Sequence, residues 1–198
     1  MHHIGMAAQT CHNDPKMREM AATVMTFKRL YSGNGNMFEQ AMALYRMNFP
    51  FHEQREDHSQ RGILTRSDYH FCLLLEDDIF VGLILYWEAD AFIVVEHFCT
   101  LPVFRGRGLG RKALEQLCAC GKTIIPEIDP PENGLAERRK AFYERVGFTA
   151  NSYSHVHPPY HADHQGHSLV VMSFPEQLTQ AQYDLFAYYL EHTAMEET

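Results

Sequence analysis

The sequence predicts one domain of the α/β or α+β class, in which a β-sheet is flanked by helices. Strand-like and helix-like patterns alternate along almost the whole chain, an order typical of such domains. The 198 residues are 45% hydrophobic and 21% charged, an ordinary globular composition with enough residues for one full core. Residues 1–198 are therefore interpreted as a single domain, and the first 20 or so, which lack periodicity, are expected to be loosely ordered.

The first half of the chain predicts a strand, a helix and a hairpin. Asn36 is placed to cap the helix, because Glu39 follows three residues later and apolar residues then recur at helical spacing. The charged segment FHEQREDHSQRG predicts a short helix or loop. The expected elements are a strand over 24–31, a helix from Asn36 to Pro50, and an antiparallel hairpin of strands 69–75 and 79–87.

The second half continues the alternation and supplies the rest of the sheet. Pro126 removes one backbone donor, so the strand that contains it cannot be fully paired on both sides. Thr179 and Gln182 form a capping box for a last helix. The expected elements are strands over 91–100 and 123–128, helices over 109–121 and 134–147, strands near 153–156 and 168–174, and a helix from Thr179.

Charge and cysteine content narrow the expected partners and location. Lys+Arg 17 against Asp+Glu 25 gives a formal net charge of -8, which argues against nucleic-acid or anionic-membrane binding and favours small cationic partners. No run reaches the about 18 apolar residues of a membrane span. The five cysteines are odd in number and fit a reducing environment, so a cytoplasmic protein is expected.

The segment RGRGLG, residues 105–110, predicts an anion-binding loop. It follows an apolar strand and opens a helix, so free backbone N–H groups meet the positive end of the helix dipole. Glycines let phosphate oxygens approach the main chain, and the arginines add charge for a pyrophosphate. The alternative is a tight turn with solvated arginines. The residues expected to hold the ligand are Arg105, Gly106, Arg107, Gly108, Leu109, Gly110 and Arg111.

Two familiar pyrophosphate ligands are disfavoured by the residues at the end of the loop. A nucleoside triphosphate loop needs Gly-Lys-Ser/Thr, whereas Gly110 is followed by Arg111 and Lys112. The dinucleotide pattern needs a third glycine where Arg111 stands. ATP and NAD therefore fit this loop poorly.

The loop and a second motif resemble the GNAT superfamily of acetyl-CoA-dependent N-acetyltransferases. The motifs are Arg105-x-x-Gly108-x-Gly110, preceded by FCTLP, and the later AFYERVGF of residues 141–148. The resemblance covers 96–148 clearly and nearly the whole chain more loosely. It implies a central mixed, mostly antiparallel sheet of about six to seven strands, with a splay between two central parallel strands. It also implies that the loop binds the pyrophosphate and pantetheine of acetyl-CoA, with no metal.

Further cofactor contacts are carried over from the same resemblance. The backbone groups of Phe98, Cys99 and Thr100 would face the splay and bind the thioester oxygen and pantetheine amides. Many family members have Ala four residues before the motif tyrosine, where this chain has Arg139. Arg139 and its neighbour Arg138 would either reach the cofactor or pair with Glu127 and Asp129, and both alternatives stay open.

Acetyl transfer needs an unprotonated amine and a proton for the departing thiolate. Glu96 is the one acid inside the strand over 91–100 and lies two residues before Phe98, hence on the same face. It is a candidate base, and the alternative is a buried carboxylate paired with an arginine. The resemblance makes Tyr143 the proton donor to the thiolate, and the alternative is a core tyrosine beside Phe142.

Three residues are candidates for binding the acceptor. Glu127, between Pro126 and DPP, suits a cation and is an alternative base. Glu53 lies where the substrate-facing helices of GNAT proteins fall, although a charged surface position is an equal alternative. Tyr160, in the segment HPPYH, is expected on one wall of the cleft.

Two other signals have simpler explanations. Cys99 suggests an acetyl-cysteine route, but no base is placed to activate it, so a small core residue is expected. The histidines between 155 and 167 lack a CxxC partner or an HxxxH pair, so a polar loop is expected rather than a zinc site.

These observations predict an N-acetyltransferase that moves the acetyl group of acetyl-CoA to a primary amine of a small molecule or peptide by direct attack. One rival is a non-catalytic module that binds or senses acetyl-CoA, and another is a regulatory protein that binds a nucleotide. The aromatic helix after Thr179 is a candidate contact for a homodimer.

Overall fold

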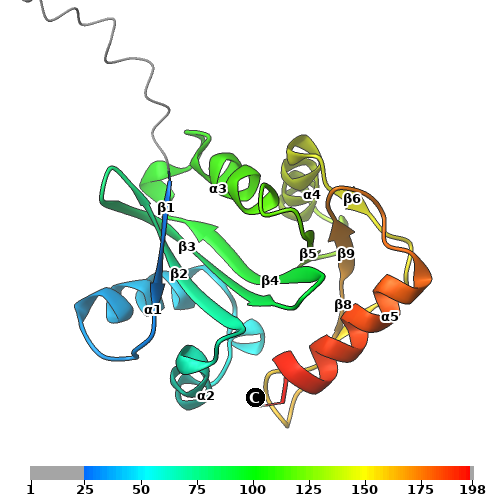
Figure 1. Ribbon diagram of the computed structural model, residues 1–198, viewed down its shortest axis with the longest axis horizontal. Coiled ribbons are helices and arrows are strands. Elements are labelled where there is room, and N and C mark those ends of the chain that lie inside the picture. Colours follow the sequence, from blue (N-terminus) through cyan, green and yellow to red (C-terminus); the bar gives the residue numbers. More distant parts are fainter. Residues whose placement is uncertain (1–24, 197–198) are drawn as a thin grey trace, which may run out of the picture.

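A seven-stranded sheet with helices on both faces forms the centre of the computed structural model, which describes residues 25–196 (Figure 1). The expectation for the first 20 residues lies outside the described residues. The strand order is β1-β2-β3-β4-β5-β9-β6, and among these strands only β4 and β5 pair in parallel. The predicted mixed, mostly antiparallel sheet is thus confirmed.

The strands mostly follow the predicted ranges. They are β1 (Thr26–Leu30), β2 (Tyr69–Glu76), β3 (Ile79–Glu88), β4 (Phe92–Thr100), β5 (Thr123–Ile128), β6 (Thr149–Ala150) and β9 (Val170–Ser173), with β7 (Val156–His157) and β8 (His167–Ser168) as a separate pair. The strand expected near 153–156 is reduced to β7, and that expected over 168–174 is divided between β8 and β9. The short strand β6 carries no alternating pattern long enough to predict it.

The longer helices lie where periodicity predicts them, and the shortest α-helix lies in the charged segment that was expected to form a short helix or loop. They are α1 (Asn36–Asn48), α2 (Asp57–Gly62), α3 (Leu109–Cys118), α4 (Gly134–Val146) and α5 (Gln180–Tyr189), with single turns η2 (Phe51–Glu53), η3 (Ile63–Thr65) and η4 (Pro102–Phe104) and a π-helical turn η5 (Leu190–Ala194). The capping box of Thr179 and Gln182 is confirmed. The cap assigned to Asn36 is wrong, because Gly35 holds that position with φ 102° and no side chain caps the helix.

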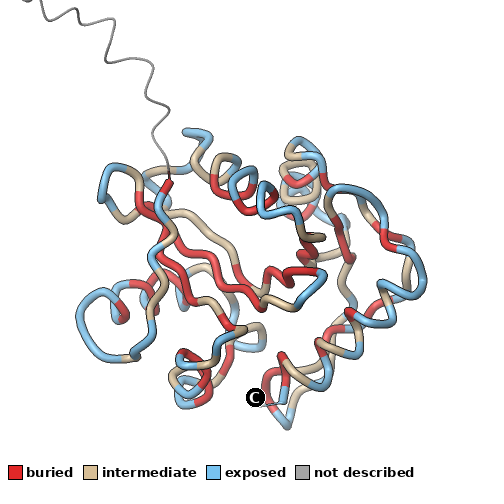
Figure 2. The backbone as a smooth tube through the Cα atoms, in the orientation of Figure 1, coloured by how far each residue is buried: buried red, intermediate tan, exposed pale blue. Residues whose placement is uncertain are grey.

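Two apolar clusters join the layers, one on each face of the sheet. The first packs β-strand residues against α1, η3 and α5, for example Phe38, Leu64 and Phe186. The second packs the opposite face against α3 and α4, through residues such as Leu114 and Tyr143. Figure 2 shows that burial is concentrated along the central strands, with the outer sides of the helices exposed. None of the helices in residues 25–196 is long and apolar enough to span a membrane.

The sheet opens between β4 and β5, as predicted. The parallel pairing runs only from Phe92↔Thr123 to Val95↔Pro126. Beyond that point β4 continues to Thr100 beside β3, whereas Glu127 and Ile128 pair with β9. The backbone of β4 from residue 96 to 100 therefore lacks a strand partner on its β5 side among the described residues, which leaves a gap between the strands.

A β-bulge at Glu96 changes which way the end of β4 faces. Leu85 pairs with His97 and Tyr86 with Val95, so Glu96 is an extra residue in the ladder. The prediction that Glu96 and Phe98 share a face is wrong, because the bulge interrupts the alternation. Glu96 contacts Arg55, whereas Phe98 packs with the second cluster against α4.

The close approach of β3 to the end of β4 gives a stability prediction. A Cβ added to Gly82 would lie 2.4 Å from the carbonyl oxygen of Cys99, where only a backbone shift could relieve the clash. Gly82→Ala should lower the free energy of unfolding by about 1–3 kcal/mol in urea denaturation. The control is Gly62→Ala in α2, where no atom lies within 4 Å of the new Cβ, and this change should preserve or raise stability. Equal midpoints for Gly82→Ala and the wild type would contradict the close approach.

Candidate active site

The start of α3 has the features of an anion site. Gly106 and Gly108 adopt φ of 74° and 78°, a left-handed conformation that favours glycine. Gly108 is the N-cap, and no side chain caps the helix, so its first N–H groups are available to a ligand. Gly110 lets the helix pack against Phe98 and Phe142, whose ring atoms lie 3.4 and 3.5 Å from the position that a Cβ would take.

A groove of about 890 Å³ runs from this helix start toward the gap in the sheet. It lies between the end of α1, the end of β4, the glycine loop and α4. The predicted cofactor residues that line it are Phe98, Cys99, Thr100, Arg105, Gly106, Gly108, Leu109, Gly110, Arg111 and Arg139. The volume of the groove and its several arginines fit a large anion such as coenzyme A.

The arginines of the loop have different partners. Arg105 donates to Asn48 Oδ1 at 2.6 Å and so links the loop to α1. Arg111 pairs with Glu115, one turn further along α3. Arg107 is the predicted cofactor residue that the structure does not bring to the groove lining, since its guanidinium lies over the Phe104 ring, 5.3 Å from the centroid.

Helix α4 supplies three groove residues that were not predicted from the sequence. Leu135, Phe142 and Arg145 line the groove together with Arg138, for which the sequence left contact with the cofactor as one of two alternatives. Their spacing of three, four and seven residues places all four on one helix face, and this signal could have identified them.

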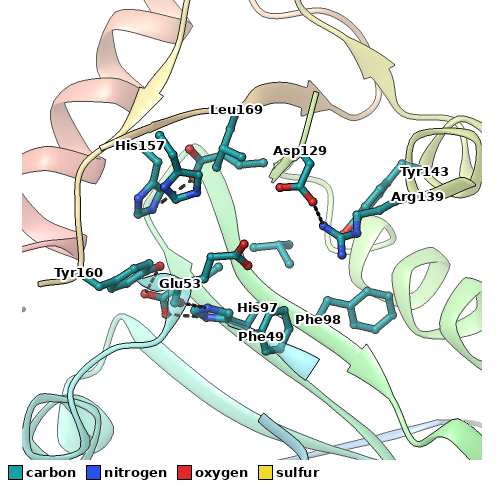
Figure 3. A pocket seen from close by; sticks show the side chains of 14 residues that line it. Phe49, Glu53, His97, Phe98, Asp129, Arg139, Tyr143, His157, Tyr160 and Leu169 are labelled. Carbon is teal, nitrogen blue, oxygen red and sulfur yellow. Dashed lines mark hydrogen bonds and ion pairs between the residues drawn. The ribbon is translucent and has the colours of Figure 1, made fainter. Parts of the chain in front are cut away.

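A second, smaller cavity of about 80 Å³ meets the groove at Tyr143 (Figure 3). Phe49, Phe98, Arg139 and Tyr143 line both spaces. Burial raises the pKa of Tyr143 to about 12, although the nearby charge of Arg139 opposes the shift. A neutral phenol therefore stands where the groove opens into the cavity.

Glu96 lines this cavity but is held in a buried ion pair. Its Oε1 accepts from Arg55 at 2.8 Å and from the hydroxyl of Tyr160 at 3.2 Å. Burial favours the neutral acid, but the charges of Arg55 and His97 outweigh it and hold the pKa of Glu96 well below its usual range. Glu96 is therefore a poor proton acceptor near neutral pH.

Glu127 lies on the same cavity with a different set of partners. One carboxylate oxygen accepts from Nε2 of His155, and the other lies 3.8 Å from Nε2 of His157. Burial alone would raise the pKa of Glu127, but these histidines lower it, so the carboxylate is ionised at neutral pH. The expectation of a polar loop around these histidines is wrong for His155, His157 and His161, which are all buried.

Two more acidic residues, Glu53 and Asp129, line the cavity in addition to Glu96 and Glu127. Burial, together with the negative charge of Asp129, raises the pKa of Glu53. Asp129 accepts from Arg139 at 2.5 Å, which is one of the two arrangements that the sequence left open for this arginine. Tyr160 lies on the other side of the cavity from Arg139 (Figure 3). Glu53, Glu127 and Tyr160, the three predicted acceptor residues, are thus brought together.

Two alternative chemistries have no support in this arrangement. Burial raises the pKa of the Cys99 thiol to about 12, so the thiolate that a nucleophile requires is disfavoured. Within residues 25–196, no group of three or more His, Cys, Asp or Glu side chains is arranged to hold a metal ion.

Comparison with known proteins relates the central part of the chain to a family of acetyltransferases. A family described as an acetyltransferase (GNAT) domain matches residues 67–150. The Bacillus subtilis (strain 168) protein YjbC, named as an acetyltransferase, is 31% identical over 104 residues, which make up 50% of this chain and 52% of that protein. The match thus spans about half the length of the curated relative.

Solved structures share the fold over a larger part of the chain. A Bacteroides thetaiotaomicron protein named for the GNAT family has a TM-score of 0.81 and 28% identity, and the match covers 86% of this chain and 98% of that one. An aminoglycoside 6'-N-acetyltransferase complexed with coenzyme A has a TM-score of 0.54 at 16% identity, over 75% and 95% of the two chains. The chain is therefore similar to GNAT acetyltransferases in sequence over residues 67–150 and in fold over most of its length.

Proposed function

We propose that this protein transfers an acetyl group from acetyl-CoA to a primary amine. One observation carries the proposal: a basic groove leads from the open end of α3 to Tyr143 and there meets a cavity with acidic walls. The groove suits the donor and the cavity suits a cationic acceptor. Acetyl-CoA would supply the activated acyl group, and the chain would bind and orient both substrates.

The donor side would be held mainly by backbone groups and arginines. The first N–H groups of α3 would bind the pyrophosphate, together with Arg105 and the arginines of α4. The backbone N–H and C=O groups of residues 98–100 that have no strand partner would form hydrogen bonds with the pantetheine arm, which would lie in the gap of the sheet. Tyr143 would give its proton to the departing sulfur.

The acceptor side favours a small amine that carries positive charge. Glu53, Glu127 and Asp129 all line the cavity, and its volume of about 80 Å³ has room only for the end of a molecule. Attack by the amine on the thioester is the simplest route, because Cys99 is not activated. Catalysis by Glu96 stays a prediction, which its ion pair with Arg55 disfavours.

The function is tested by thiol release from acetyl-CoA across a panel of polyamines, amino sugars, amino-acid derivatives and peptides. At least one amine should raise thiol release well above hydrolysis. If none does, while coenzyme A still binds, the non-catalytic sensing alternative replaces the enzyme.

Stabilisation by an added ligand distinguishes coenzyme A from ATP and NAD as the compound that the groove binds. At a concentration of coenzyme A 100 times its Kd, the free energy of unfolding should rise by about 2.7 kcal/mol. ATP and NAD should change the melting temperature little, because the loop lacks the residues that those ligands need. A larger shift with ATP or NAD than with coenzyme A would favour a nucleotide-binding regulatory protein.

A further inference from the structure

We propose that His157 is the general base that takes the proton from the acceptor amine. The inference rests on the acetyl transfer proposed above and adds a residue that the sequence alone placed in a polar loop. It depends on which ring nitrogen of His157 is basic, on what that nitrogen faces, and on the cavity that the ring shares with Tyr143.

The hydrogen bond of Nδ1 fixes the tautomer of His157. Nδ1 lies 2.6 Å from the carbonyl oxygen of Pro158, and a carbonyl can only accept. Nδ1 therefore carries a proton, and the lone pair of the neutral ring is on Nε2. A ring held in this way presents one defined basic nitrogen.

The basic nitrogen of His157, Nε2, lies near the carboxylate of Glu127, and both residues line the cavity. Nε2 lies 3.8 Å from Glu127 Oε2, which is too long for a direct hydrogen bond and leaves Nε2 available. A carboxylate at this distance in a buried site stabilises the positive charge that the ring gains with a proton. The other oxygen of Glu127 is bound to His155, so the carboxylate is fixed in place.

The charged neighbours of His157 come from several elements. Glu127 of β5 is beside it, and Glu53 of η2 and Asp129 after β5 line the same cavity. His167 of β8 has its ring centroid 5.7 Å away, and burial, followed by the charges of His157 and His52, lowers the pKa of His167. A neutral His167 does not oppose a positive His157. The remaining titratable groups on the cavity are Glu96, His97, Arg139, Tyr143 and Tyr160.

His157 and Tyr143 line the same cavity and lie apart across it, as the two proton-transfer roles require (Figure 3). The amine nitrogen forms a bond to the acetyl carbon, and its proton passes to Nε2 of His157. The carbon–sulfur bond breaks, and the sulfur takes the hydroxyl proton of Tyr143. The products are an N-acetyl amine and a free thiol, and the proton on His157 returns through solvent to the Tyr143 phenolate.

The test is the pH dependence of kcat/KM for His157→Gln, with an amine found active in the thiol-release panel. His164→Gln is the matched control, because this histidine is on the same segment but does not line the cavity. His157→Gln should lower kcat by about 100-fold or more. It should also remove the pH-dependent rise and plateau of the wild type, so that the rate follows only the ionisation of the amine. His164→Gln should keep the wild-type rate and profile.

Imidazole rescue and binding measurements keep the test decisive. His157→Ala should regain part of its rate when free imidazole is added, and both variants should retain the melting shift with coenzyme A. A wild-type rate and profile in His157→Gln would overturn the inference and indicate that Glu127 or a water chain takes the proton. A variant that loses the coenzyme A shift and shows no rescue would also overturn it, in favour of a structural role. Absence of thiol release in the wild type would instead refute the proposed function.

Discussion

Replacing Tyr143 with phenylalanine is expected to reduce acetyl transfer by about 100-fold or more while leaving coenzyme A binding almost unchanged. The thiolate that leaves the thioester needs a proton, and the neutral hydroxyl of Tyr143 stands where the groove meets the cavity. Phenylalanine keeps the ring contacts with Phe142 and Phe148 and removes only the oxygen. The variant should therefore fold and bind like the wild type.

Thiol release measures the rate of Tyr143→Phe, and the melting shift with coenzyme A measures its binding. Tyr188→Phe is the matched control, since Tyr188 is exposed on α5, and this change should alter neither quantity. A Tyr143→Phe enzyme with wild-type kcat would show that the proton comes from elsewhere and that Tyr143 is a core residue.

Replacing Arg55 with methionine is expected to lower the free energy of unfolding by about 3–5 kcal/mol at neutral pH. The Arg55 side chain is fully buried and donates to Glu96 at 2.8 Å and to the carbonyl of Ala194 at 2.6 Å. Methionine occupies much of the same volume but leaves the Glu96 carboxylate buried without its counter-charge. Urea unfolding measures the loss.

Two further variants distinguish the effect of breaking the buried ion pair from the effect of removing any arginine. Arg46→Met removes one partner of the exposed pair with Asp57 and should cost less than about 1 kcal/mol. The double variant Arg55→Met with Glu96→Gln removes both buried charges and should recover part of the loss. If Arg55→Met costs no more than Arg46→Met, the pair with Glu96 does not stabilise the fold.

The cost of Arg55→Met should depend on pH in a defined direction. The pKa of Glu96 is lower in the folded protein than its ordinary value of 4.5, so its ionised form stabilises the fold above that pH. This contribution is lost as the pH falls below 4.5 toward the folded pKa. The difference between the wild type and Arg55→Met should therefore be largest near neutral pH and shrink in acid.

The regular parts of the fold and the groove beside the glycine loop can be predicted from patterns in the sequence. Periodicity predicts the main strands and helices, and the RGRGLG loop with AFYERVGF indicates the groove, because glycines and arginines before a helix bind anions wherever the helix lies. The gap in the sheet agrees with Pro126, which cannot complete a ladder.

The parts that the sequence could not predict depend on tertiary contacts. The bulge at Glu96 leaves no local signal, so simple alternation put its side chain on the wrong face. His155 and His161 are in a polar segment and are buried because Glu127 and Glu56, far away in the chain, pair with them. Arg55 lies in a charged segment that carries no sign of its burial, because its partner Glu96 is 41 residues away.

The groove comes mostly from one stretch of the chain, whereas the cavity combines residues of that stretch with residues of its flanks. The family match of residues 67–150 contains the glycine loop and Tyr143, and also Glu127 and Asp129 of the cavity. The other cavity residues Glu53, His157, Tyr160 and His167 lie outside it, in the flanking segments. A flank grafted from a relative onto this core should therefore alter the choice of amine and leave the proposed binding of coenzyme A intact. Such modularity would let one acyl-donor platform acquire new acceptors by exchange of its borders alone.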